Sequence, residues 1–239
     1  MATDTQARLP LSRERILQAA LELADENGIE SLTMRKLGRT LGFEAMSLYN
    51  HVANKDDLLD GMLDLVLAES EPPSAEVEWA TAIRTSANSV HQALRRHPWS
   101  CALLMSPGRI RPSRLRYMDQ LLGRLRQAGF SADATYTAYH VVDGYIFGFS
   151  LWESSHTYTA EDISKFAAVL FTEIITPDAY PYLHEHAQQH MSEGPHREVS
   201  SFEVGLDLIV DGLEKLLASG AGLDRHQEDD HQEDPEQHA

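Results

Sequence analysis

Hydrophobic residues recur along most of the chain at the three- to four-residue spacing of an α-helix. Between Ser12 and Asn27 one face of the expected helix carries Ile16, Leu17, Ala20, Leu23 and Ala24. Ser12 is a suitable N-cap, and Gly28 is a suitable terminator. No segment shows the β-branched alternation of a strand, so the pattern predicts an all-α fold.

Two short helices are expected next: Thr33 caps the first, which runs through Leu41, and the second covers Ala45–His51. Gly42 between them permits the positive φ that a sharp turn requires. With the first helix they form a compact three-helix unit, which predicts a helix-turn-helix DNA-binding domain over residues 12–53.

A connecting helix is expected over residues 54–71. Asn54 is its N-cap, and Asp56 and Asp57 lie in the first turn, where the helix dipole favours negative charge. Its wide apolar face can join the small domain to the rest of the chain. Pro72 and Pro73 end the helix and mark a domain boundary.

Residues 72–218 are expected to form a larger helical domain for ligand binding and dimerisation. Helical patterns cover Trp79–Arg96, Pro98–Met105, Pro112–Ala128, Ala132–Ser154, Ala160–Ile175 and Ser201–Ala218. The stretch from Pro177 to Val199 is the least regular before the C-terminal tail, and we interpret it as a long loop.

Composition restricts the class of protein. The chain has 239 residues, of which 42% are hydrophobic, enough for one substantial core and a smaller one. The single cysteine, Cys101, excludes an intramolecular disulfide framework, fits a reducing compartment and is interpreted as a small buried hydrophobe. No leader-like stretch opens the chain and no segment is apolar enough to span a membrane, so we expect a soluble cytoplasmic protein.

The net charge of −17 is unfavourable for binding a polyanion, but the charge is unevenly distributed. From Ser31 to Lys55 four basic residues face one acid, Glu44, which gives this stretch +3. Residues 219–239 carry seven acids against Arg225, which gives −6, and are expected to be a disordered acidic tail. Residues 1–11 are expected to be a flexible arm, from which Arg8 can enter a minor groove.

No catalytic constellation is recognisable: there is no P-loop, no glycine-rich dinucleotide turn and no His-Glu-x-x-His. We therefore expect neither an enzyme nor a cofactor. His184, His186 and His190 have a spacing that could supply three nitrogen ligands to a metal ion. Surface histidines in a polar loop explain the same pattern, and no metal site is predicted. A protein-interaction adaptor and a helical enzyme with an accessory nucleic-acid module remain as alternatives.

The order of these motifs resembles the TetR family of transcriptional regulators. It runs Leu-Thr-Met-Arg-Lys-Leu from Leu32, then Leu-Gly-Phe from Leu41, then Ser47-Leu48-Tyr49-x-His51, then Asn54-Lys55-Asp56-Asp57-Leu58-Leu59. The body is similar to the tetracycline-repressor branch in His97-Pro98, in Ala128-Gly129-Phe130-Ser131, and in the run from Phe202 to Lys215.

The resemblance implies a homodimer that places two recognition helices in a palindromic operator, about one turn of DNA apart (~34 Å). It also implies a dimer interface formed by helices 132–154 and 201–218 of each protomer. The residues concerned are Gly144 on the first helix and, with Phe202, the stripe Leu206, Ile209, Val210, Leu213 and Leu217 on the second. The alternative is that this stripe faces its own core.

Roles in DNA binding are implied by the same resemblance. Arg35 matches a base or phosphate contact, Thr33 a backbone contact, and the exposed positions that read base edges are Ala45, Met46, Ser47 and Asn50. Tyr49, His51 and Lys55 match phosphate contacts, although Tyr49 can instead pack into the core. Tetracycline repressors have a polar residue and proline at positions 45 and 46, so their operator cannot be assumed here.

A sensor also needs an effector cavity, for which helices 79–96 and 132–154 are the expected walls. The candidate lining comprises Ser86, Asn88, Val90, His91, Trp99, Leu104, His140, Asp143, Tyr145, Phe147, Phe149 and Trp152. Ser86, Leu104 and Pro107 stand where tetracycline-sensing members carry amide, imidazole and hydroxyl groups. A small hydrophobic or aromatic effector is therefore expected rather than tetracycline. The sequence does not separate repression from activation.

Overall fold

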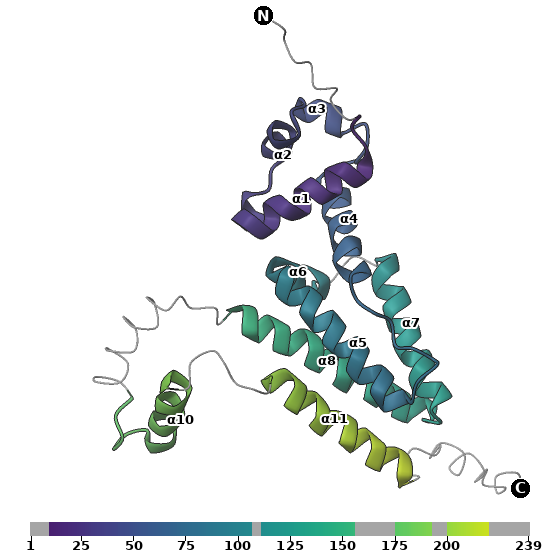
Figure 1. Cartoon of the computed structure of the whole chain (residues 1–239), viewed down its shortest axis with the longest axis vertical. Coiled ribbons are helices and arrows are strands. Elements are labelled where there is room, and N and C mark those ends of the chain that lie inside the picture. The colour runs from purple at the N-terminus through teal and green to yellow at the C-terminus, as the bar shows by residue number, and fades with distance from the viewer. Residues whose placement is uncertain (1–9, 107–110, 156–174, 193–199, 220–239) are drawn as a thin grey trace, which may run out of the picture.

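The computed structural model describes residues 10–106, 111–155, 175–192 and 200–219. Within these ranges the chain is helical and contains no strand (Figure 1). A small N-terminal group of helices lies at one end of the molecule, and the helix α4 leads from it into a larger bundle. The all-helical expectation is confirmed.

The N-terminal group consists of α1 (Arg13–Asn27), the short 3-10 helix η1 (Ile29–Ser31), α2 (Met34–Leu41) and α3 (Ala45–Leu48). Ser12 caps α1, because its Oγ accepts a hydrogen bond from the Arg15 amide at 3.2 Å. Gly28, with φ of 77°, ends the helix. Side chains from all three α-helices share a small core, among them Ile16, Leu37 and Leu48.

Helix α3 is shorter than expected. The sequence predicted it to His51, but the α-helix ends at Leu48 and a turn follows. The Asn50 amide bonds to the Ser47 carbonyl and the His51 amide to the Leu48 carbonyl, both three residues back. The chain tightens here because Val52 is buried and the next helix begins only a few residues later.

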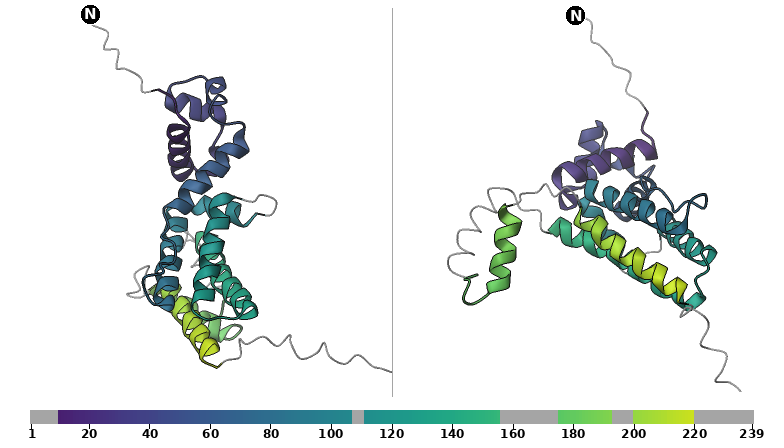
Figure 2. Two further views of the ribbon diagram at one scale, coloured as in Figure 1. Left: turned by 90° about the vertical axis from the view of Figure 1, so that its right-hand side faces the viewer. Right: turned by 60° about the horizontal axis from the view of Figure 1, so that its bottom comes forward.

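Helix α4 (Lys55–Ala68) belongs to both parts of the molecule (Figure 2). Leu58 and Met62 pack into the N-terminal core, whereas Leu63 and Leu67 pack into the core of the larger bundle. A displacement of α4 therefore involves both cores at once.

The larger bundle contains α5 (Trp79–Arg96), α6 (Pro98–Met105), α7 (Pro112–Gln127), α8 (Ala132–Ser155) and α11 (Ser201–Ala218). Its core is rich in rings and branched side chains, including Phe147, Phe202, Ile83, Leu94 and Leu121. Helices α8 and α11 lie side by side along one flank, as both views show (Figures 1 and 2). None of the described helices combines the length and apolarity needed to cross a bilayer.

The interpretation of the stretch from Pro177 to Val199 as a loop was wrong in part, because Pro181–Ser192 forms the helix α10. Pro181 fits the first turn of a helix, where the missing amide is not needed, and the His184 amide bonds to the Tyr180 carbonyl at 2.9 Å. The helix expected at 160–175 lies outside the described residues except for Ile175. Most of the expected arm and tail, with Arg8, also lies outside them.

Candidate DNA interface and effector site

Helices α2 and α3 meet at a close backbone contact. A Cβ atom added to Gly38 would lie 2.8 Å from the Phe43 carbonyl oxygen and 3.2 Å from the Ala45 amide nitrogen. Gly42, with φ of 75°, forms the left-handed end of α2. Thr33 caps the start of α2, since its Oγ1 accepts a bond from the Lys36 amide at 3.1 Å. The two glycines thus set the angle at which α3 is presented.

The residues expected to contact DNA lie on or beside this unit, and most are exposed. Met46 is 74% exposed and Tyr49 42%, so the tyrosine ring is not part of the core. The other exposed members of the set are Thr33, Arg35, Asn50 and Lys55. Ala45, Ser47 and His51 are half-buried at the edge of the same surface.

The turn between α3 and α4 is braced from α1. The Arg13 guanidinium makes two bonds to Asp57, at 2.7 and 2.9 Å, and a third to the His51 carbonyl oxygen at 3.1 Å. Asp57 also accepts a bond from the Ala53 amide at 2.8 Å. The bonds from Arg13 and Ala53 lower the pKa of Asp57 to about 2. His51 and Lys55 are thus presented on a fixed turn.

This brace predicts a pH dependence. Ionised Asp57 stabilises the fold at every pH above its unfolded pKa near 4, and the effect is lost as the pH falls from about 4 to 2. Because a third of the carboxylate is exposed, we expect Asp57→Asn to lower the free energy of unfolding by about 1 kcal/mol at pH 7. Urea unfolding across this range checks it. A difference that persists unchanged at pH 2 would contradict the assignment.

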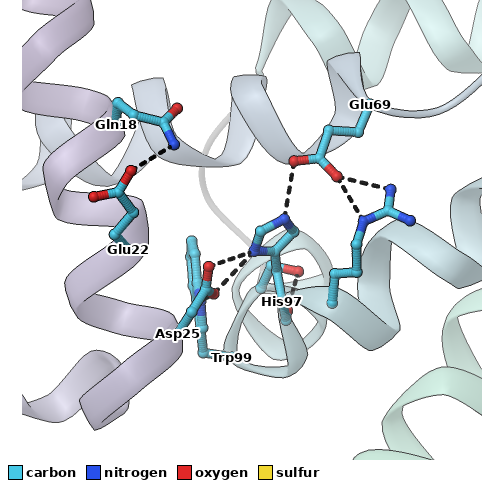
Figure 3. A network of polar contacts seen from close by, with 8 residues as sticks. Gln18, Glu22, Asp25, Glu69, His97 and Trp99 are labelled. Atoms are coloured by element: carbon cyan, nitrogen blue, oxygen red, sulfur yellow. Dashed lines mark hydrogen bonds and ion pairs between the residues drawn. The ribbon is translucent and has the colours of Figure 1, made fainter.

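His97 is a buried residue between α5 and α6, and it contacts both α1 and the end of α4 (Figure 3). Its Nδ1 lies 2.9 Å from Asp25 of α1, and its Nε2 lies 3.0 Å from Glu69 at the end of α4. The Trp99 indole nitrogen donates to Asp25 at 2.8 Å, and Arg96 pairs with Glu69 at 2.7 Å. This joint connects the N-terminal unit, the connecting helix and the body.

Helix α4 is also attached to the start of α7. The Nε atom of the buried Arg111 lies 3.2 Å from Oδ1 of Asp60. The Ser113 hydroxyl donates a hydrogen bond to Asp64. The acidic side of α4 therefore contacts α7 at Asp60 and Asp64, and the α5–α6 corner at Glu69. The body is thus linked to α4 by these polar contacts as well as by the shared core.

The expected effector residues do not all converge on one place. Ser86 donates to the Glu71 carbonyl at 2.8 Å, and Asn88 donates to the Arg84 carbonyl at 3.0 Å. Val90 and Leu104 are core residues, whereas His140 and Trp152 are exposed. The first four side chains therefore have structural contacts within the protomer.

Most of the remaining candidates form two groups, whereas Trp99 lies apart at the His97 joint. The first group surrounds Phe202 and includes Phe149, whose ring centroid lies 5.4 Å from that of Phe202 and 5.5 Å from that of Trp152. His91 stacks on Phe202, with ring centroids 3.8 Å apart, and Tyr145 stacks on the same ring at 5.2 Å. Burial, with a smaller contribution from Arg95, lowers the pKa of His91 to about 4, so the ring is neutral at physiological pH. Asp143 and Phe147, one turn apart on α8, both contact Arg114 of α7.

Sequence reasoning missed Arg114. Its Nη2 lies 2.6 Å from Asp143, and its guanidinium lies over the Phe147 ring, 4.4 Å from the centroid. Burial is the largest single effect and opposes the charge, but the bond to Asp143 and the charge of Asp143, with smaller contributions from Tyr139 and Tyr117, together raise the pKa of Arg114. The only signal in the sequence was an arginine on the face of α7 that also carries Tyr117 and Leu121.

The stripe on α11 is divided between two environments. Phe202, Leu206, Val210 and Leu213 are buried in their own protomer, which is the alternative stated above, and Ile209 and Leu217 pack partly against that core. The exposed apolar side of α11 carries Val204 and Leu208 instead. On α8, Gly144 is exposed, with open space beyond it.

Two minor expectations concern single side chains. Cys101 is buried, and burial raises the pKa of its thiol to about 11, as expected of an unreactive core residue. His184 bonds to the Ile175 carbonyl oxygen at 2.8 Å. Across the described ranges no group of three histidine, cysteine or acidic side chains is placed to hold a metal ion.

Comparisons with known proteins match both parts of this architecture to described protein families. Residues 16–62 match the family model "Bacterial regulatory proteins, tetR family", and residues 71–217 match "Tetracyclin repressor-like, C-terminal domain". The HTH-type transcriptional repressor DrrR1 of Streptomyces coeruleorubidus is 30% identical over 224 residues, which cover 89% of this chain and 80% of that protein. The class D tetracycline repressor of Escherichia coli is 31% identical over 215 residues, 87% of this chain and 92% of that protein.

Solved structures of TetR family proteins have a similar fold. ActR of Streptomyces coelicolor in complex with actinorhodin superposes with a TM-score of 0.69 at 26% identity, covering 86% of this chain and 96% of that one. Both family models describe regulators rather than enzymes, which answers the alternative of a helical enzyme. An N-terminal helix-turn-helix unit joined to a tetracycline-repressor-like body identifies the chain as a member of the TetR family of DNA-binding transcriptional regulators.

Proposed function

We propose that the protein is a homodimeric repressor that binds a palindromic operator and is released by a small hydrophobic or aromatic effector. The observation that carries the proposal is the α2–α3 unit, whose exposed Arg35, Met46 and Asn50 stand on a buried scaffold shared with α4. In this division residues 12–53 read DNA, residues 54–71 connect, and residues 72–218 sense the effector and dimerise.

At the DNA surface the proposal separates positioning from reading. Thr33, Tyr49, His51 and Lys55 contact phosphates and set the register, whereas the residues of α3 face base edges. Ala45 and Met46 offer only apolar atoms, which suit a thymine methyl group. Arg35 is exposed at the start of α2 and supplies positive charge beside α3.

For the dimer interface we propose the exposed side of α8 and α11. Arg84 of α5 fixes the rotation of α11 by bonding to Asp207 at 2.7 Å and Asp211 at 2.9 Å. Val204 and Leu208 on this helix are 48% and 71% exposed. Gly144 and Gly148 on α8 have open space beyond them, which allows a second helix to approach closely.

Effector binding is proposed to act through α4. An effector that prefers one arrangement of the body shifts the population toward it, and the contacts at His97, Arg111 and Ser113 carry the change to α4. The similarity to ActR, solved with actinorhodin, supports a small-molecule effector.

The experiment that tests DNA binding uses genomic fragments selected by the wild-type protein. We expect Arg35→Ala and Lys55→Ala each to weaken binding, and each lost phosphate contact to reduce the slope of log K against log salt by about 1. Fluorescence anisotropy at salt concentrations from about 50 to about 200 mM measures these slopes. Arg116→Ala, an exposed arginine on α7, is the control. Unchanged binding in both test variants would favour the protein-interaction adaptor.

A further inference from the structure

The ion pair between Arg114 and Asp143 is only half completed. One bond joins Arg114 Nη2 to Asp143 Oδ2 at 2.6 Å, while Arg114 Nη1 and Asp143 Oδ1 are buried without a hydrogen-bond partner. Arginine and carboxylate can form two parallel bonds, but here only one is made. Buried polar atoms are rarely left unsatisfied, because each costs about 1–3 kcal/mol. Both atoms are therefore open to a further polar group.

The two open atoms define the chemistry of that group. Arg114 Nη1 donates a hydrogen bond and Asp143 Oδ1 accepts one, so the partner must offer an acceptor and a donor side by side. A carboxylate or phosphate meets Arg114 but is repelled by Asp143, and an ammonium group meets the opposite difficulty. Hydroxyl and amide groups satisfy both atoms without charge.

The surroundings add aromatic character. The Phe147 ring lies under the guanidinium, and the Tyr117 ring centroid is 5.5 Å from the same group. Burial, reinforced by the charge of Asp143, raises the pKa of Tyr117 and of Tyr139, and a hydrogen bond to Asp143 adds to the rise for Tyr139, so both phenols stay neutral at physiological pH. A flat ring placed here meets other rings, and its polar substituent meets the open atoms.

We propose that Arg114 and Asp143 form the polar anchor of the effector site, and that the effector is a neutral aromatic molecule bearing a hydroxyl or amide group. The inference rests on the proposed function, whose effector it specifies. Arg114 also follows Ser113, whose hydroxyl binds Asp64 of α4, and Arg111 lies one turn earlier, bound to Asp60. An effector held by Arg114 acts on the turn of α7 that holds the connecting helix.

The test compares 2-naphthamide with 2-naphthoate, two probes of nearly equal shape. The amide carries a donor and an acceptor, whereas the carboxylate carries two acceptors and a charge. We expect calorimetry on the full-length protein to show at least tenfold tighter binding of 2-naphthamide. Asp143→Asn removes the repelling charge, so the preference should shrink by several-fold.

The second part of the test removes both residues of the proposed anchor, Arg114 and Asp143. Arg114→Met/Asp143→Leu replaces the pair with apolar side chains of similar size, a change that folded proteins tolerate. We expect 2-naphthamide affinity to fall at least tenfold while the thermal unfolding transition is retained. Arg116→Met, two residues along α7, should leave the affinity unchanged.

Three results would overturn the inference: equal or tighter binding of 2-naphthoate, no saturable binding of 2-naphthamide, or full 2-naphthamide affinity in the double variant. None of these readouts involves DNA. A protein that binds its operator but not 2-naphthamide therefore refutes only the anchor. One that binds 2-naphthamide but selects no DNA refutes the proposed function instead.

Discussion

Gly38→Ala is expected to weaken operator binding by up to about 100-fold while the body remains folded. The added methyl group would lie 2.8 Å from the Phe43 carbonyl oxygen and 3.3 Å from the Ala45 Cα atom. Both atoms belong to the backbone, so the contact is relieved only by moving α3 away from α2. Overpacking of this kind costs about 1–3 kcal/mol, and roughly 3 kcal/mol of lost binding corresponds to a factor of about 100. Fluorescence anisotropy with the selected operator measures it.

Gly123→Ala is the matched control, because a Cβ atom at this position of α7 has open space around it. Alanine is the better helix former by about 1 kcal/mol, so this variant should bind DNA normally and unfold at a slightly higher temperature. Near-normal operator affinity in Gly38→Ala would show that α3 is not the reading element.

Leu208→Asp is expected to convert the dimer into monomers and to reduce operator affinity at least 100-fold. Leu208 is 71% exposed and lies on the same side of α11 as Val204, so its loss leaves the protomer core intact. Two carboxylates brought together at an apolar interface oppose association. A single reading unit also loses the gain of about 10²–10⁴ that comes from linking two binding units. Sedimentation velocity and anisotropy report the two effects.

Leu115→Asp provides the comparison, since Leu115 is also an exposed leucine, 49% accessible, but on α7. It should remain dimeric and bind DNA as the wild type does. A Leu208→Asp protein that still sediments as a dimer would place the interface elsewhere on the molecule.

Local signals explain why the N-terminal unit was predictable. Ser12, Thr33 and Asn54 each cap a helix in the structure, as their positions suggested, and Gly42 has the left-handed conformation expected between α2 and α3. Caps and turn glycines act within a few residues, so a sequence displays them directly. The end of α3 was misplaced because the burial of Val52 depends on other helices.

Tertiary contacts explain what was missed. The helical period identified one face of α11, but it does not state whether that face meets its own protomer or a partner. Leu206 and Val210 proved to lie in the core, where α11 packs against α5 and α8. The pairing of Arg114 with Asp143 joins residues on different helices, and nothing local marks either side chain for it.

The joint at His97 limits which N-terminal segments can be combined with this body. Its imidazole is held between a carboxylate that belongs to the DNA-reading half and another at the end of α4. A chimeric regulator that carries a foreign N-terminal segment on this body must therefore supply an acid at position 25. Without one, the hybrid keeps an imidazole contact on one side only, and its new specificity comes with weaker transmission from the sensor.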